Sequence, residues 1–180
     1  MPHSTQSPPL EVSIRRARPS DSEAIGEIRV RAWQAAYPTF MPSAYLSALD
    51  PGANLDGLRK LISDDVPLPL VTVAELHGIT CGFTLLGAPR MPRDGTTHEL
   101  WALNVSPAHW RAGIATKLVE RALSDANSSG AVEVELWCIS GNIPAESLYR
   151  RCGFRRTGET RTTNHHTGIP LKETRFILPA

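Results

Sequence analysis

The segment 99–116 constrains the fold of this chain more than any other. An apolar run ends at Val105, Ser106-Pro107 turns the chain, and a glycine-containing loop at 110–115 opens directly into a helical pattern. A strand, a loop and a helix in this order leave a run of backbone N–H groups without partners at the helix N-terminus. Such a run binds phosphate or pyrophosphate groups. The sequence therefore predicts a phosphate-binding loop here.

Length and composition indicate one domain with a buried core. The first nine residues are polar and proline-rich, so we expect a disordered lead-in at 1–9 and a single domain at 10–180. A net charge of +1 argues against a nucleic-acid partner. No apolar run reaches membrane-spanning length and no signal-peptide pattern is present, which predicts a cytoplasmic protein without membrane contact. The three scattered cysteines indicate reduced thiols.

Hydrophobic periodicity predicts a mixed α/β (α+β) fold with the order β-α-α-β-β-β-α-β-α-β-β. Its sheet is mostly antiparallel, with a βαβ unit from Glu99 to Cys138. A capping box at 20–23 marks the first helix, and His77-Gly78 marks a hairpin. The expected strands are 10–17, 70–75, 79–86, 99–105, 131–138, 155–162 and 172–178. The expected helices are one that starts at the capping box and continues to about Tyr37, and those at 43–49, 55–62, 114–126 and 143–152.

Three motifs stand in order along this pattern. The first is the strand and loop at 103–115, the second is Gly141-Asn142, and the third is the Tyr-x-x-x-Gly-Phe segment at 149–154. With these motifs on these elements, the chain resembles the GCN5-related N-acetyltransferase (GNAT) superfamily over nearly its whole length. The family's loop motif usually begins with Gln or Arg, whereas this chain has Trp110 followed by Arg111.

The resemblance implies that acetyl-CoA is the cosubstrate. In the family, two central strands part, usually with a bulge in the first, and their free backbone groups bind the pantetheine arm while the loop binds the pyrophosphate. For Asn142, a plain helix N-cap is the alternative to contact with pantetheine. The implied coenzyme-binding residues are Leu103, Asn104, Val105, Arg111, Ala112, Gly113, Ile114, Ala115, Thr116 and Asn142.

The resemblance also implies two catalytic side chains. Glu99 lies eleven residues before the first loop-motif position, where the histone-acetyltransferase branch carries its general base. The alternatives for Glu99 are a solvated carboxylate at a strand end and an ion-pair partner. Tyr149 matches the family tyrosine that protonates the leaving thiolate, and its alternative is packing of the helix against the sheet.

We therefore expect an N-acetyltransferase that moves an acetyl group from acetyl-CoA to a primary amine of a small molecule or a protein. The amine would attack the thioester directly in a ternary complex. The alternative is a non-catalytic module that binds or senses acyl-CoA. Exposed strand edges allow a homodimer. His165-His166 has no third ligand nearby in the sequence, so no metal site is predicted.

Overall fold

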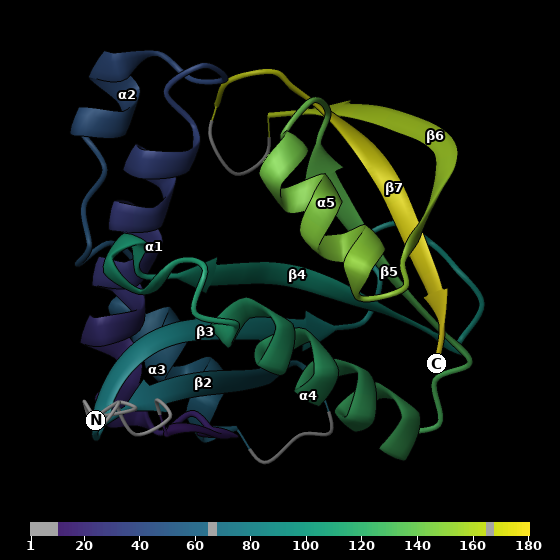
Figure 1. Ribbon diagram of the computed structural model, residues 1–180, viewed down its shortest axis with the longest axis horizontal. Coiled ribbons are helices and arrows are strands. Elements are labelled where there is room, and N and C mark those ends of the chain that lie inside the picture. Colours follow the sequence, from purple (N-terminus) through teal and green to yellow (C-terminus); the bar gives the residue numbers. More distant parts are fainter. Residues whose placement is uncertain (1–10, 65–67, 165–167) are drawn as a thin grey trace, which may run out of the picture.

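The computed structural model describes residues 11–64, 68–164 and 168–180, which form one open seven-stranded sheet with helices on both faces (Figure 1). The strand order is β1-β2-β3-β4-β5-β7-β6, and every neighbouring pair is antiparallel except β4 with β5. This confirms the predicted mixed, mostly antiparallel sheet. The strands are β1 (Val12–Arg16), β2 (Leu70–Leu76), β3 (Ile79–Gly87), β4 (Thr97–Val105), β5 (Glu133–Ile139), β6 (Arg155–Thr163) and β7 (Leu171–Pro179). The predicted lead-in at 1–9 and the pair His165-His166 lie outside the described residues.

Helices cover both faces of the sheet, and a helix forms in each of the five segments where one was expected. The predicted element order counts two helices between β1 and β2, whereas the three expected segments form three separate helices, because prolines and the Asp50-Pro51-Gly52 turn divide this part of the chain. No helix in the described ranges is long and apolar enough to cross a membrane. The helices are α1 (Ser22–Ala36), α2 (Ser43–Ser47), α3 (Leu55–Ser63), α4 (Ile114–Ser128) and α5 (Ile143–Arg151).

The helix predicted after the loop is present as α4, and one face of it is an apolar stripe. Leu118, Val119, Ala122 and Ala126 are fully or almost fully buried, at the spacing that puts them on one face. They pack on the sheet face that α5 also covers, while α1 and α3 pack on the opposite face. Full burial of a leucine such as Leu118 contributes about 1.5–3 kcal/mol. This packing fixes the start of α4, and with it the loop that precedes the helix.

Two local predictions have different outcomes. The hairpin is confirmed, since His77 and Gly78 both have the positive φ of a tight turn between β2 and β3. The first long helix is present and begins at Ser22, but the predicted capping box is wrong, because no side chain caps its N-terminus. Asp21 instead accepts from the backbone N–H of Arg18 and from the guanidinium of Arg15, while the Glu23 side chain pairs with Arg59 on α3.

The two central strands separate after a short parallel stretch. Thr97–Glu99 of β4 pair with Glu133–Glu135 of β5, and beyond these residues the ladder stops and the strands diverge (Figure 1). We call the point just past Glu99 and Glu135 the fork. The register between β3 and β4 slips at Leu85/Leu86, which leaves Trp101 as an extra residue in β4. Both the parted strands and the bulge in the first of them are confirmed.

Candidate coenzyme and acceptor site

The loop before α4 presents a row of open backbone donors. Among the residues that the structure describes, none of the N–H groups from Arg111 to Thr116 has an acceptor, and the first helical bond runs from Lys117 to the carbonyl of Gly113. Arg111 and Gly113 both have positive φ, at 64° and 78°, so the backbone turns its N–H groups around a concave loop. The partial positive charge of the α4 N-terminus adds to this field. The arrangement can hold a diphosphate.

Gly113 and Trp110 shape this loop in different ways. A Cβ added to Gly113 would meet open space, so its glycine is favoured by the left-handed backbone rather than by crowding. The Trp110 indole N–H donates to the carbonyl oxygen of Val105 at 2.7 Å, which ties the loop to the end of β4. Where the family motif usually has Gln or Arg, this chain therefore has a tryptophan that anchors the loop.

A groove of about 380 Å³ runs from α1 through the fork to α5. Four of the predicted site residues line this groove, whereas Glu99 and the loop at 111–116 do not. The four are Leu103, Asn104, Asn142 and Tyr149. Past Glu99, the edge of β4 that faces β5 has no strand partner among the described residues. An extended, amide-containing chain could therefore lie along this edge as an added strand would.

The surroundings of Tyr149 are compatible with both predicted alternatives, packing of the helix against the sheet and proton donation to the thiolate. Its ring packs edge-on against Phe154 and, tilted, against Phe176 in the core. No described residue hydrogen-bonds its hydroxyl, although the residue lines the groove. Burial raises the pKa of Tyr149 above its usual range, with Cys138 and Tyr37 contributing. The hydroxyl therefore stays protonated at physiological pH, as a proton donor must.

Asn142 acts as the N-cap of α5. Its side-chain oxygen accepts from the backbone N–H of Ala145 at 3.4 Å, and the residue is buried against the groove. This geometry supports the N-cap alternative. The side-chain amide nitrogen of Asn142 has no hydrogen-bond partner among the described residues, so contact with a ligand in the groove stays a prediction.

Glu99 is fully buried beneath the segment that follows β3. Its two carboxylate oxygens accept from the backbone N–H, Nε and Nη2 of Arg90 at 2.7, 2.8 and 2.5 Å. Next to it across the fork, Glu135 is also fully buried and binds Arg93 and Arg175. The geometry supports the ion-pair alternative for Glu99. Its role as general base stays a prediction.

Three further residues line the groove that were not among the predicted site residues. The Trp137 indole N–H is buried without a partner among the described residues, which is a hydrogen bond that a ligand in the groove can complete. Glu173 lines the groove and pairs with Arg161, whose guanidinium also lies 4.1 Å from the Trp137 ring centre. Burial, with Cys138 and Glu173 nearby, raises the pKa of Tyr37 to about 12. Trp137 pairs with Arg175, which is two residues from Glu173 on β7, so the alternation of the strands puts Trp137 and Glu173 on the same face of the sheet. This face lines a groove only because the strands part at the fork.

The described residues include no group of three or more His, Cys, Asp or Glu side chains that could hold a metal ion. A family model described as the Acetyltransferase (GNAT) family matches residues 23–154 of the 180. The chain belongs to the GNAT family. The match includes α1, the fork, the loop at 111–116 and α5, which together form the site described above.

Known proteins are similar to this chain over part or nearly all of its length. A mycothiol acetyltransferase of Clavibacter sepedonicus is 32% identical over 89 residues, which are 49% of this GNAT chain and 28% of that protein. The PaiA N-acetyltransferase of Thermoplasma acidophilum in complex with coenzyme A superposes with a TM-score of 0.78 over 95% of this chain and 100% of its own, at 18% identity. YncA of Salmonella typhimurium with acetyl-CoA gives a TM-score of 0.68 at 25% identity, covering 93% of each chain. These structures confirm the fold.

Proposed function

We propose that this GNAT chain is an N-acetyltransferase that uses acetyl-CoA as cosubstrate and acetylates a primary amine of a small molecule or a protein. The observation that carries the proposal is the row of six open N–H groups at residues 111–116, beside strands that part. Two structural neighbours hold coenzyme A or acetyl-CoA in the same fold, which supports the choice of ligand.

The residues of this chain fit coenzyme A. The N–H groups of the loop bind the diphosphate, helped by the α4 dipole. The free edge of β4 at Leu103–Val105 binds the amides of the pantetheine arm, and Asn142 lies across the groove from this edge. When bound, the coenzyme supplies an acetyl thioester, and a backbone N–H of β4 polarises its carbonyl.

Acetyl transfer then needs two proton movements. The acceptor nitrogen loses a proton and bonds to the acetyl carbon as the carbon–sulfur bond breaks, and the departing sulfur gains a proton. Tyr149 donates that second proton, because its hydroxyl is protonated and free in the groove. For the first proton, Glu99 is the base that the family resemblance implies, while Glu173 is the carboxylate that lines the groove.

The test is to incubate the purified protein with acetyl-CoA and a mixed panel of amines, and to follow thiol release and acetyl mass. Acetylation of an amine in the panel supports the proposal. Coenzyme binding without transfer to any amine would favour the non-catalytic module, and absence of coenzyme binding would contradict both functions.

A further inference from the structure

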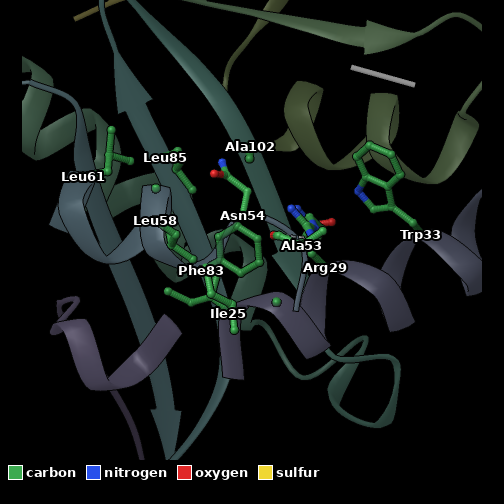
Figure 2. A pocket seen from close by; sticks show the side chains of 14 residues that line it. Ile25, Arg29, Trp33, Ala53, Asn54, Leu58, Leu61, Phe83, Leu85 and Ala102 are labelled. Carbon is green, nitrogen blue, oxygen red and sulfur yellow. Dashed lines mark hydrogen bonds between the residues drawn. The ribbon is translucent and has the colours of Figure 1, made fainter. Parts of the chain in front are cut away.

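A second hollow opens into the groove beside α1. We call this hollow of about 280 Å³ the side pocket; it lies between α1, α3 and the neighbouring faces of β3 and β4 (Figure 2). The two hollows meet, because the same five residues line both. These shared residues are Arg29, Trp33, Leu85, Ala102 and Asn104. A molecule whose reactive end lies at the fork can therefore extend its other end into the side pocket.

The inner part of the side pocket is apolar. Ile25, Phe83 and Leu58 gather there from α1, β3 and α3 (Figure 2). Its outer wall is the turn before α3, which approaches α1 closely at Gly26; a Cβ on Gly26 would collide with the carbonyl oxygen of Pro51. This shape fits one apolar side chain, whose burial is favourable in proportion to its area.

Arg29 stands where the two hollows meet. It lies one helical turn from Ile25 and one from Trp33 on the same face of α1, and Figure 2 shows it between them. Its Nη2 makes two long hydrogen bonds, 3.3 and 3.4 Å, to the carbonyl oxygens of Asp50 and Ala53. Among the described residues, no carboxylate lies within ion-pair distance of Arg29 and no acceptor within hydrogen-bond distance of its Nε and Nη1.

Five arginines around the sheet whose side chains are largely covered contrast with Arg29, because each of them meets at least one carboxylate within 3.0 Å; they are Arg15, Arg90, Arg93, Arg161 and Arg175. The sheet arginines that have no such partner among the described residues, Arg16, Arg155 and Arg156, are exposed to solvent. A half-buried guanidinium without such a partner, beside apolar side chains, attracts a carboxylate from a ligand. The Asn104 side-chain amide also lacks a partner among the described residues, and it lies on β4 at the same junction.

We infer that the acetyl acceptor is a free α-amino acid with an apolar side chain. Its carboxylate pairs with Arg29, its side chain occupies the side pocket, and its amino group passes Asn104 toward the fork. This inference rests on the proposed N-acetyltransferase function and names the substrate class for it. The products are the N-acetylamino acid and coenzyme A.

The experiment compares acceptors that differ in one group at a time. L-Phenylalanine and L-leucine are set against their carboxamides, against phenethylamine, and against glycine, with spermidine and an alanyl peptide in the same panel. We expect the two free apolar amino acids to have a kcat/KM about tenfold or more above that of every other compound, because a charged hydrogen-bonded pair or a buried side chain is lost in each comparison.

Variants of Arg29 separate recognition from folding. Arg29→Gln should raise the KM for L-phenylalanine about tenfold, leave the KM for acetyl-CoA unchanged and abolish the preference for acid over amide. Arg29→Lys should retain part of that preference, because the cation remains. The matched control is Arg31→Gln, since Arg31 is exposed on the same helix and pairs only with Glu27 among the described residues.

Each outcome decides the inference. If the amides are acetylated as well as the acids, or if spermidine or the peptide is preferred, the substrate class is wrong while the N-acetyltransferase function stands. If thiol release and acetyl mass are absent with every amine, the proposed function fails and the substrate class with it. A loss in Arg29→Gln that affects acids and amides equally would show that Arg29 only supports the wall of the side pocket.

Discussion

The loop at 111–116 and the buried glutamates at the fork differ in what satisfies their polar groups. In the loop, six backbone N–H groups have no acceptor among the described residues. At the fork, Glu99 and Glu135 are fully buried, and arginines from the segment between β3 and β4 and from β7 bind them, although the Oε1 of Glu135 has no hydrogen-bond partner among the described residues. Open donors on a rigid backbone indicate a ligand site, whereas a buried charge with its own counter-ions indicates a role in holding the fold.

The type of a residue therefore indicates a functional site less reliably than the number of its hydrogen-bond donors and acceptors that the protein leaves without partners. A glutamate at the mouth of a parted sheet can be a base only if its carboxylate reaches the substrate. Glu99 already accepts three hydrogen bonds from Arg90. In the loop, all six N–H donors are still available, so a ligand can form more new hydrogen bonds there than at the fork.

The largest effect is expected from Glu135→Ala, which leaves Arg93 and Arg175 without their buried carboxylate. The free energy of unfolding should fall by about 3–5 kcal/mol, as measured by denaturant titration. The control is Glu133→Ala on the same strand, because Glu133 is partly exposed and its pair with Arg175 contributes about 0–1 kcal/mol. If the two variants lower the free energy of unfolding equally, the buried ion pairs at the fork contribute no more to stability than an ordinary surface ion pair.

Tyr149→Phe tests whether the open loop and the groove serve one ligand. If the loop holds the coenzyme and its sulfur reaches the groove, kcat should fall by about 10²-fold with the coenzyme Kd unchanged. Because the pKa of Tyr149 is raised, the wild-type rate should show no loss from its ionisation as pH rises toward 10. Tyr45→Phe on α2 is the control, and an unchanged kcat in Tyr149→Phe would reject the acid role.

Glu99→Gln divides the two roles of Glu99. If the ion pair with Arg90 is its function, the free energy of unfolding should fall by about 1–3 kcal/mol while the pH–rate profile keeps its shape. Loss of the ascending limb of that profile, in a variant of unchanged stability, would instead establish Glu99 as the base. The pH–rate profile of Glu173→Gln, measured in parallel, shows whether the carboxylate of Glu173 in the groove is the general base instead.

Gly113→Ala should have the smallest effect on folding and a specific effect on ligand binding. A left-handed residue other than glycine costs about 1–2 kcal/mol, and the distorted loop should bind coenzyme A about tenfold more weakly in calorimetry. Gly130→Ala is a matched control, since Gly130 also has positive φ with open space around it, but follows the far end of α4. Equal coenzyme affinity in the two variants would contradict the assignment of the loop.

Local sequence signals predicted the elements that depend on local interactions. The hairpin at His77-Gly78, the stripe of α4 and the loop before it each follow from turn residues or helical spacing. The sequence could not reveal that Arg90 reaches back to Glu99 or that Glu23 pairs with Arg59, because these contacts join separate elements. The predicted capping box is wrong for the same reason, because the Glu23 side chain pairs with Arg59 on α3 instead of capping the N-terminus of α1.

The groove residues show the same limit. Asn104 and Tyr149 were identified because they stand in family motifs. Arg29, Trp137 and Glu173 lie on three elements that meet only in the folded chain, and nothing in their own segments distinguishes them from ordinary surface or sheet residues. The residues that we propose for acceptor recognition could therefore not be found from the sequence, whereas the loop that we propose for coenzyme binding is a local pattern and could be.

The most direct test follows the backbone amides of residues 111–116 by NMR while coenzyme A or pantetheine, which lacks the diphosphate, is added. The account predicts that coenzyme A shifts these six N–H resonances and slows their hydrogen exchange, whereas pantetheine leaves them in place. Unmoved resonances at saturating coenzyme A, or equal shifts with pantetheine, would contradict the claim that this loop binds the diphosphate.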